Sequence, residues 1–481
     1  MTEQQKTEPE HRPEGQRDLE NEAGREAERE AIYDAEGDLR PDFVDEVSDA
    51  IEAGDATGVR EALEGLHESE QADVLEALDE DERQPLVDLA GDAFDYAALT
   101  EVDEAIRLDI VENLGPEKLA EAVGELASDE AVFILEDMED ADREAVLKQL
   151  PFQERVRLRR SLEYPEETAG RRMQTEVVAV PPFWTVGQAI DFMREADDLP
   201  ERFSQVYCVE PTFRLAGVLP LDVLLRARRP VVIADIMEEA RPIRADLDQE
   251  EAAAIFERYD LLAAPVIDEN ERLVGVLTVD DIVDVIQSEA DEDIRRLAGV
   301  GDEELSDRVR EITRSRFPWL LVNLATAVLA SLIIGLFDAT ISQMVALAVL
   351  MPIVASMGGN AATQTMTVAV RGLATRDLSG FNARRIIKKE LIVGLLNGVG
   401  FAVIIGIVAW LWFGSLDLGL VIAIAMVVNM IAAAAAGILI PIALDRLKAD
   451  PAIASGVFVT TVTDVVGFFA FLGLAAIWFG I

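Results

Sequence analysis

The sequence is poor in the residues that build cross-links and many metal centres. Cys208 is the only cysteine among 481 residues, and His11 and His67 are the only histidines. A lone cysteine excludes a disulfide framework and a thiolate metal cluster. Both histidines lie far from the apolar C-terminal third, which excludes an intramembrane metalloprotease with an H-E-x-x-H motif there. The sequence also lacks a Walker-type Gly-Lys-Ser/Thr loop, so we expect no ATP hydrolysis and no enzyme.

Lysine is scarce as well. Only six of the 42 basic residues are lysine, against 91 acidic residues and a net charge of −49. Residues 1–316 hold 34 basic and 84 acidic side chains, whereas residues 317–481 hold eight and seven. An acidic, lysine-poor surface is tolerable where salt screens the repulsion between carboxylates, so we expect a halophilic archaeal source. We expect no nucleic-acid partner.

The acidic two-thirds begin with a tract that hardly contains an apolar side chain. Residues 1–40 are predicted to be a disordered tail. A basic and then apolar signal sequence is missing from it, so this part of the chain is expected to stay in the cytoplasm.

Residues 41–163 have the pattern of short amphipathic helices. Related phrases, VLEALDEDER, IVENLGPEKL and ILEDMEDADR, begin at residues 74, 110 and 134. Their spacing of 36 and 24 residues is irregular, which favours stacked helical hairpins over a strict solenoid. The prediction is an α-helical, superhelical N-terminal domain.

Residues 164–288 alternate β-branched runs with helical patterns. The phrase RLAGVLPLDVLL from Arg214 returns as RLVGVLTVDDIV from Arg272, 58 residues later. Two βαββα units, about 169–229 and 233–288, predict an α/β tandem pair that shares one pseudo-twofold core. The pair resembles tandem CBS domains. Residues 289–316 are predicted to form one long charged helix that continues into the membrane.

Apolar runs in residues 317–481 predict an all-α transmembrane domain in the lipid bilayer. The five expected helices are 317–337, 341–370, 391–413, 419–444 and 453–479. Basic residues crowd the loop after the second run and recur after the fourth, whereas the loops 338–340 and 414–418 have none. The positive-inside rule therefore predicts a multi-pass protein of the cell membrane, with a cytoplasmic N-terminus and an outer C-terminus.

One carboxylate lies inside the last apolar run. Asp464 is the only charged residue between Pro451 and Ile481, ~20 Å from the start of this run at ~1.5 Å per residue. Placing an ionisable group at that depth costs ~2.5–3.5 kcal/mol on insertion scales, and such groups usually face a polar pathway. Asp464 therefore predicts a route for cations.

The second run contains several residues that are unusual in an apolar helix: Pro352, Gly358, Gly359, Asn360, Thr363 and Gln364. Proline and paired glycines predict a broken helix whose free carbonyls line a wet cavity. Close helix packing through small residues is the alternative. Asn397 and Asn429, in the third and fourth runs, predict interhelical hydrogen bonds or, alternatively, pore-lining positions.

These motifs together resemble the MgtE family of magnesium transporters. The matching phrases are YPEETAGRRM from Tyr164, EADEDIRRLAGV from Glu289, the second-run motif from Pro352 to Gln364, Asp450-Pro451-Ala452, and TTVTD ending at Asp464. The resemblance covers nearly everything after residue 41. One departure is Ala362, where the family commonly has glycine, and its methyl group is expected to narrow or stiffen the filter.

The resemblance implies a homodimer in which the helical domain, the CBS pair and a connecting plug helix, residues 289–316, regulate a five-helix pore. Mg²⁺ would be both the transported and the regulatory ion. The implied selectivity residues are Asp464, Gly358, Gly359, Asn360, Thr363 and Gln364, with Asp464 holding hydrated Mg²⁺ between two chains. The membrane potential alone would drive entry, since a divalent ion gains ~4.6 kcal/mol per 100 mV.

A second set of acids lies at the end of the CBS pair and along the connector: Asp281, Asp284, Glu289, Glu292 and Asp293. Their spacing places them on shared helix faces, where unpaired carboxylates repel. The resemblance implies that Mg²⁺ bridges them to the other chain or to the helical domain, where Asp137 and Asp140 are the expected partners, and thereby closes the pore. The alternative is an ordinary acidic surface. An adenine nucleotide at the CBS pair is left open.

Other functions remain as alternatives. One is a CBS-regulated transporter of Co²⁺ or Mn²⁺, and another is a membrane-anchored Mg²⁺ sensor that transports nothing. A simple anchor does not need Asp464 at bilayer depth. A chloride channel with CBS domains is disfavoured by an acid in the pore.

Overall fold

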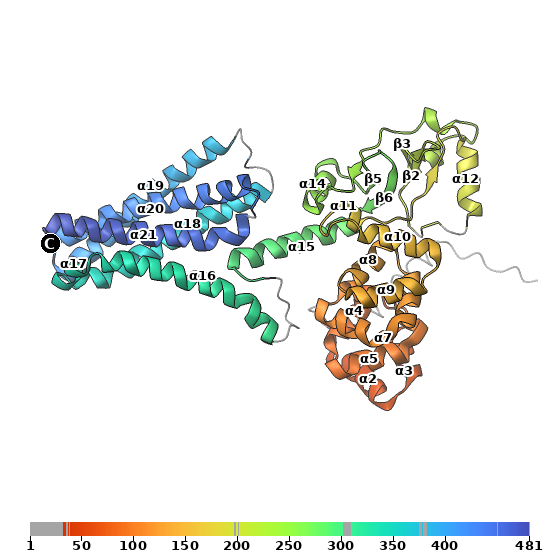
Figure 1. Ribbon diagram of the computed structural model, residues 1–481, viewed down its shortest axis with the longest axis horizontal. Coiled ribbons are helices and arrows are strands. Elements are labelled where there is room, and N and C mark those ends of the chain that lie inside the picture. Colours follow the sequence, from red (N-terminus) through yellow and green to blue (C-terminus); the bar gives the residue numbers. More distant parts are fainter. Residues whose placement is uncertain are drawn as a thin grey trace, which may run out of the picture. The chain divides into compact units, whose positions relative to one another are not determined.

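The computed structural model describes residues 32–34, 37, 39–196, 199–200, 202–301, 309–374, 378, 382–449 and 451–480. Most of the predicted acidic tail lies outside these ranges. The chain forms two compact units, one up to Ile282 and one from Val283 onward (Figure 1). Each unit is described by itself.

The first unit begins with a helical domain, as predicted. Its helices are α2 (Pro41–Ala53), α3 (Ala56–Leu63), α4 (Glu68–Ala77), α5 (Glu80–Ala90), α6 (Ala98–Glu101), α7 (Glu104–Glu125), α8 (Ser128–Glu136), α9 (Asp140–Gln149) and α10 (Phe152–Leu162). Acids fix several starts: the backbone N–H of Asp79 donates to Glu82 Oε2 at 3.2 Å, a capping-box contact. One apolar core, including Val47, Leu75 and Leu135, joins the helices.

Two βαββα units follow, which confirms the predicted tandem pair. The first comprises β1 (Ala179–Val180), α12 (Val186–Glu195), β2 (Gln205–Val209), β3 (Leu215–Pro220) and α13 (Leu221–Arg226). The second comprises β4 (Ile243–Arg244), α14 (Gln249–Tyr259), β5 (Ala263–Ile267), β6 (Leu273–Thr278) and α15 (Val279–Ala298). In each sheet the middle strand pairs parallel with the first strand and antiparallel with the third.

The repeated phrases meet at the pseudo-twofold axis. The N–H of Leu215 donates to Glu271 O at 3.1 Å, and the N–H of Leu273 donates to Phe213 O at 2.9 Å. Side chains of both units, among them Tyr207 and Val276, form one small core. The predicted shared core is therefore confirmed.

The connector differs from the expectation of one helix over 289–316. Helix α15 starts at Val279 and ends at Ala298, where Gly299 adopts φ +72° and the N–H of Val300 donates to Arg295 O at 3.0 Å. A left-handed glycine with this hydrogen bond ends a helix. The prediction of one continuous helix is wrong, because it followed the charged pattern of the segment and did not recognise Gly299 as a C-cap.

The second unit is a bundle of long helices (Figure 1). They are α16 (Val309–Gly335), α18 (Ala346–Ala374), α19 (Ala383–Phe413), α20 (Leu416–Arg446) and α21 (Pro451–Phe479), with the short α17 (Asp338–Gln343) between the first two. Within the described ranges, five helices are long and apolar enough to cross a membrane. The predicted second span began too early, because residues 338–343 form α17. Helix α20 packs against α18, α19 and α21.

Candidate functional site

Asp464 lies on α21, half-buried in the apolar bundle. The threonines before it hydrogen-bond to their own helix: Thr460 Oγ1 donates to Gly456 O at 2.9 Å, and the buried Thr463 Oγ1 donates to Thr460 O at 2.9 Å. No ion pair of Asp464 is found among the described residues. Asp464 is therefore a carboxylate at bilayer depth without a basic partner in the described chain.

Helix α18 is continuous through the motif that predicted a break. It runs from Ala346 to Ala374 with Pro352 inside it. Gly359 O and Thr363 O accept hydrogen bonds from Thr363 Oγ1 and Thr367 Oγ1, each at 3.0 Å. The expectation of a broken second span is wrong, because an unpaired backbone group is so costly in hydrocarbon that the helix persists despite its glycines.

Four polar side chains of α18 share one face. Asn360, Thr363, Gln364 and Thr367 are all exposed in the single chain, and their spacing places them on one side of the helix. Gly358 is buried and Gly359 is half-buried. Asn and Gln are rare toward lipid, so this face points to a wet pathway or to another protein surface.

The two membrane asparagines differ in environment. Asn429 is fully buried, and its Nδ2 donates to Val354 O of α18 at 2.8 Å. The predicted interhelical hydrogen bond is thus confirmed for Asn429. Asn397 is exposed on α19.

The five predicted sensor acids all lie on α15: Asp281, Asp284, Glu289, Glu292 and Asp293. Glu292 forms an ion pair with Arg296 one turn later. Asp281 accepts hydrogen bonds from the backbone N–H of Thr278, at 3.4 Å, and from its hydroxyl. No group of three or more His, Cys, Asp or Glu side chains that could hold a metal ion is found in the described part of the chain.

The predicted partners in the helical domain have other contacts. Asp137 pairs with Arg107 at 2.6 Å, and Asp140 pairs with Arg143. The carboxylate beside Asp281 is instead Asp129, in the first turn of α8, which sequence reasoning missed. In the sequence, an acid in the first turn of a helix is explained by its interaction with the helix dipole. Only the fold shows that Asp129 lies beside Asp281.

Asp129 and Asp281 form a contact between two acids. Asp129 is 9% exposed, and its Oδ1 has no hydrogen-bond partner among the described residues. Burial and the neighbouring Asp281 raise the pKa of Asp129 well above its usual value, and burial raises the pKa of Asp281. Burial also raises the pKa of the adjacent Glu130 to about 7. This junction between α8 and α15 thus favours a bound proton or a cation.

These shifts predict a pH dependence of stability. A carboxyl group with a raised folded pKa binds more protons folded than unfolded, so stability is highest below the unfolded pKa and falls as pH rises toward the folded pKa. For Glu130 this window runs from 4.5 to about 7. The wild type should lose about 1–2 kcal/mol of unfolding free energy over this pH window, allowing for the partial exposure of Glu130, and Glu130→Gln should not show this loss. Urea unfolding of residues 1–298 followed by circular dichroism measures this loss.

The matched control for this prediction is Glu144→Gln. Glu144 is an exposed residue of α9 paired with Arg159 at 2.6 Å. An equal flattening of the pH profile in both variants would contradict the assignment to Glu130.

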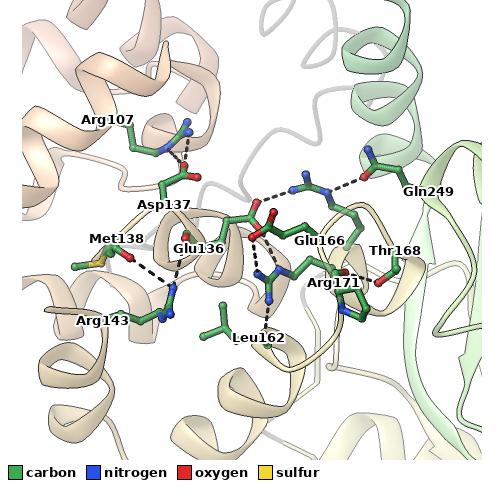
Figure 2. A network of polar contacts seen from close by, with 12 residues as sticks. Arg107, Glu136, Asp137, Met138, Arg143, Leu162, Glu166, Thr168, Arg171 and Gln249 are labelled. Atoms are coloured by element: carbon green, nitrogen blue, oxygen red, sulfur yellow. Dashed lines mark hydrogen bonds and ion pairs between the residues drawn. The ribbon is translucent and has the colours of Figure 1, made fainter. Parts of the chain in front are cut away.

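Near its other end, α8 is held by a buried ionic network (Figure 2). Glu136 Oε2 accepts from Arg171 Nε at 2.8 Å, and Glu136 Oε1 accepts from Arg172 Nη1 at 3.1 Å. Arg171 also donates to Leu162 O at 2.6 Å, and Arg172 donates to Gln249 of α14 at 3.1 Å. Both arginines lie in the short α11 (Ala169–Arg172), which connects the helical domain to the CBS pair. Figure 2 shows Arg171 extending toward Glu136.

Comparison with known proteins bears on the family. Family models match in three places: a divalent cation transporter model at residues 351–474, an MgtE intracellular N domain at 66–167, and a CBS domain at 233–288. A magnesium transporter MgtE of Enterococcus faecalis is 34% identical over 422 residues, 87% of this chain and 93% of that protein. The chain belongs to the MgtE family of magnesium transporters. Its five apolar helices therefore form the membrane part of a multi-pass transporter.

Further proteins are similar to this chain. A magnesium transporter MgtE of Thermus thermophilus is 32% identical over 89% of this chain and 97% of its own length. One of Bacillus subtilis is 33% identical over 78% of this chain and 84% of its own length. A crystal structure of the cytosolic domain of the Mg²⁺ channel MgtE in complex with ATP is 31% identical, with a TM-score of 0.46, over 50% of this chain and 99% of that one.

Proposed function

We propose that the chain carries Mg²⁺ into the cytoplasm down its electrochemical gradient, along a path that Asp464 faces. The observation that carries this proposal is a half-buried carboxylate in an apolar helix with no ion-pair partner among the described residues. Its cost at that depth is ~2.5–3.5 kcal/mol, which a passing cation would offset. Membership of a magnesium transporter family supports Mg²⁺ as that cation.

The exposed polar face of α18 supports a path made by two copies of the chain. Asn360 and Gln364 are exposed in the single chain, although lipid cannot satisfy their amides. A second copy related by a twofold axis would cover this face and add a second Asp464. Mg²⁺ gives up its waters reluctantly, so side-chain oxygens and amides would hold it through water. The carbonyls of Gly359 and Thr363 already accept threonine hydroxyls, so the side chains are the more available ligands.

The same proposal includes closure by cytosolic Mg²⁺. Two carboxylates meet at Asp129 and Asp281, with Asp129 Oδ1 unpartnered among the described residues. Mg²⁺ is usually held by one or two carboxylates plus waters, so this pair suits it. Neutralising the pair would hold α8 against the start of α15. Glu289, Glu292 and Asp293 on the same helix are the further sensor residues of this proposal.

Magnesium-auxotrophic cells test transport and closure together. We expect the wild type to restore growth in low-Mg²⁺ medium and cellular Mg²⁺, measured by atomic emission, to reach a plateau. The variant Glu289→Gln, Glu292→Gln, Asp293→Asn should also restore growth, because the pore is intact, but should exceed the plateau severalfold in high-Mg²⁺ medium. A variant with the wild-type plateau would contradict the sensing role, and no growth with the wild type would contradict transport.

Asp129→Asn provides a second view of the sensor. It removes the repulsion at Asp281 without changing side-chain shape, so we expect closure at lower internal Mg²⁺ and a lower plateau. The matched variant is Asp142→Asn, at an exposed acid in the first turn of α9, which should keep the wild-type plateau. Inward orientation of the N-terminus and an adenine nucleotide at the CBS pair remain predictions.

A further inference from the structure

The buried amide of Asn429 joins three membrane helices. Asn429 lies on α20, is fully buried, and donates from Nδ2 to Val354 O of α18 at 2.8 Å. Its neighbours Met426 and Met430 belong to the apolar core of the bundle. A polar amide thus lies among apolar side chains.

Two glycines make room for this amide. A Cβ added to Gly358 of α18 would lie 2.2 Å from Asn429 Nδ2, and one added to Gly467 of α21 would lie 2.8 Å from the same atom. Both distances are too short for any side chain. Each glycine therefore turns a Cα–H toward the amide, which brings α18 and α21 to α20 at this level.

These two glycines are next to the proposed ion-path residues. Gly358 directly precedes Gly359 and Asn360, and Gly467 follows Asp464 by three residues, on the same side of α21. The amide of Asn429 is therefore adjacent to both elements on which the ion path depends.

Stability alone does not account for Asn429. Its Oδ1 has no hydrogen-bond partner among the described residues, so the amide is only half satisfied. A half-satisfied buried polar group is worse for stability than an apolar residue of similar volume. The amide instead fixes the position of α20 relative to α18, because its Nδ2 donates to one particular carbonyl, Val354 O.

We infer that Asn429 is a positioning residue for ion selection: it sets the separation of α18 and α21, and thereby the distance from the polar face of α18 to Asp464. This inference rests on the proposed function of Asp464. A leucine at this position would fill the space but would let the two helices shift. Discrimination between ions depends on the number and placement of ligands, so it should change.

The test is uptake of Mg²⁺ and of Co²⁺ by the full-length protein in phosphatidylglycerol-containing vesicles, expressed as a ratio. A ratio does not change when fewer molecules are active, so it separates positioning from folding. We expect Asn429→Leu to change the Mg²⁺ to Co²⁺ ratio about tenfold, which corresponds to ~1.4 kcal/mol. Gly467→Ala, which crowds the same amide from α21, should change the ratio in the same direction. Asn397→Leu, at the exposed asparagine of α19, should leave it unchanged.

A wild-type ratio in both Asn429→Leu and Gly467→Ala would overturn the inference. If Asn429→Leu does not assemble, Asn429→Ser is measured; assembly with a wild-type ratio would make the residue purely structural and also overturn it. Asp464→Asn in the same vesicles distinguishes the two proposals. If Asp464→Asn loses uptake while the Asn429 variants keep the wild-type ratio, the positioning role of Asn429 is rejected and the ion path is not. If Asp464→Asn keeps full uptake, the ion path itself is rejected.

Discussion

Asp464→Asn is expected to abolish Mg²⁺ uptake. The substitution keeps the shape of the side chain and removes its charge from an apolar helix where no described basic group compensates it. At ~4 Å and an effective dielectric constant of ~20, one unit charge attracts another by ~4 kcal/mol. Losing even half of that lowers uptake by more than about tenfold. Growth of a magnesium-auxotrophic cell and uptake into vesicles both measure the effect.

Asp417→Asn is the control for charge removal in the same unit. Asp417 lies in the first turn of α20, is exposed, and accepts from Trp478 Nε1 at 3.3 Å. We expect its uptake to stay within about twofold of wild type, since surface charges contribute little to a bound ion. Equal losses in both variants would show that uptake follows net charge rather than the place of Asp464.

Glu136→Ala is expected to destabilise the junction of the helical domain and the CBS pair more than other single changes there. The Glu136 side chain is 11% exposed and compensates Arg171, which is 6% exposed. Removing one partner of a buried ion pair typically costs about 3–5 kcal/mol, because the other charge stays buried. Hydrogen exchange of α8 and α11 in the full-length protein measures the cost as faster local opening.

The comparison variant is Glu144→Ala. Glu144 and Arg159 are each about half exposed, so breaking this pair should cost less than about 1 kcal/mol. Equal protection of α8 in wild type and in Glu136→Ala would disprove the structural role of the network. In the proposed closure, a loosened α8 would also no longer hold Asp129 beside Asp281.

The elements that could be predicted were those with a signal in the chain itself. The phrase that starts at Arg214 and again at Arg272 predicts one strand in each copy, because each copy has the alternating apolar pattern of a strand. The repetition itself predicts their pseudo-twofold relation. The five spans follow from apolar length alone. Asp464 is conspicuous because it is the only charge in its run.

The errors and omissions arose where tertiary context decides. Pro352 and paired glycines predict a break in water, but in hydrocarbon α18 stays helical because no solvent can take over its backbone groups. The partner of Asp281 could not be found, since Asp129 is 152 residues away and one acid among 91. The role of Glu136 was equally hidden, because its two arginines become its partners only after folding.

Helix α15 ends just before Gly299 and packs against helices other than α16, the helix that follows it in the sequence. After Gly299 the chain leads to α16. Leu297, in the last turn of α15, nevertheless packs against an apolar cluster that includes Ala362 of α18, Ala433 of α20 and Val459 of α21. In the proposed closure, a displacement of α15 would therefore press directly on the helices of the proposed ion path and would not have to bend α16 first. Control of the ion path would then depend on direct packing of α15 against the bundle rather than on its covalent connection to α16.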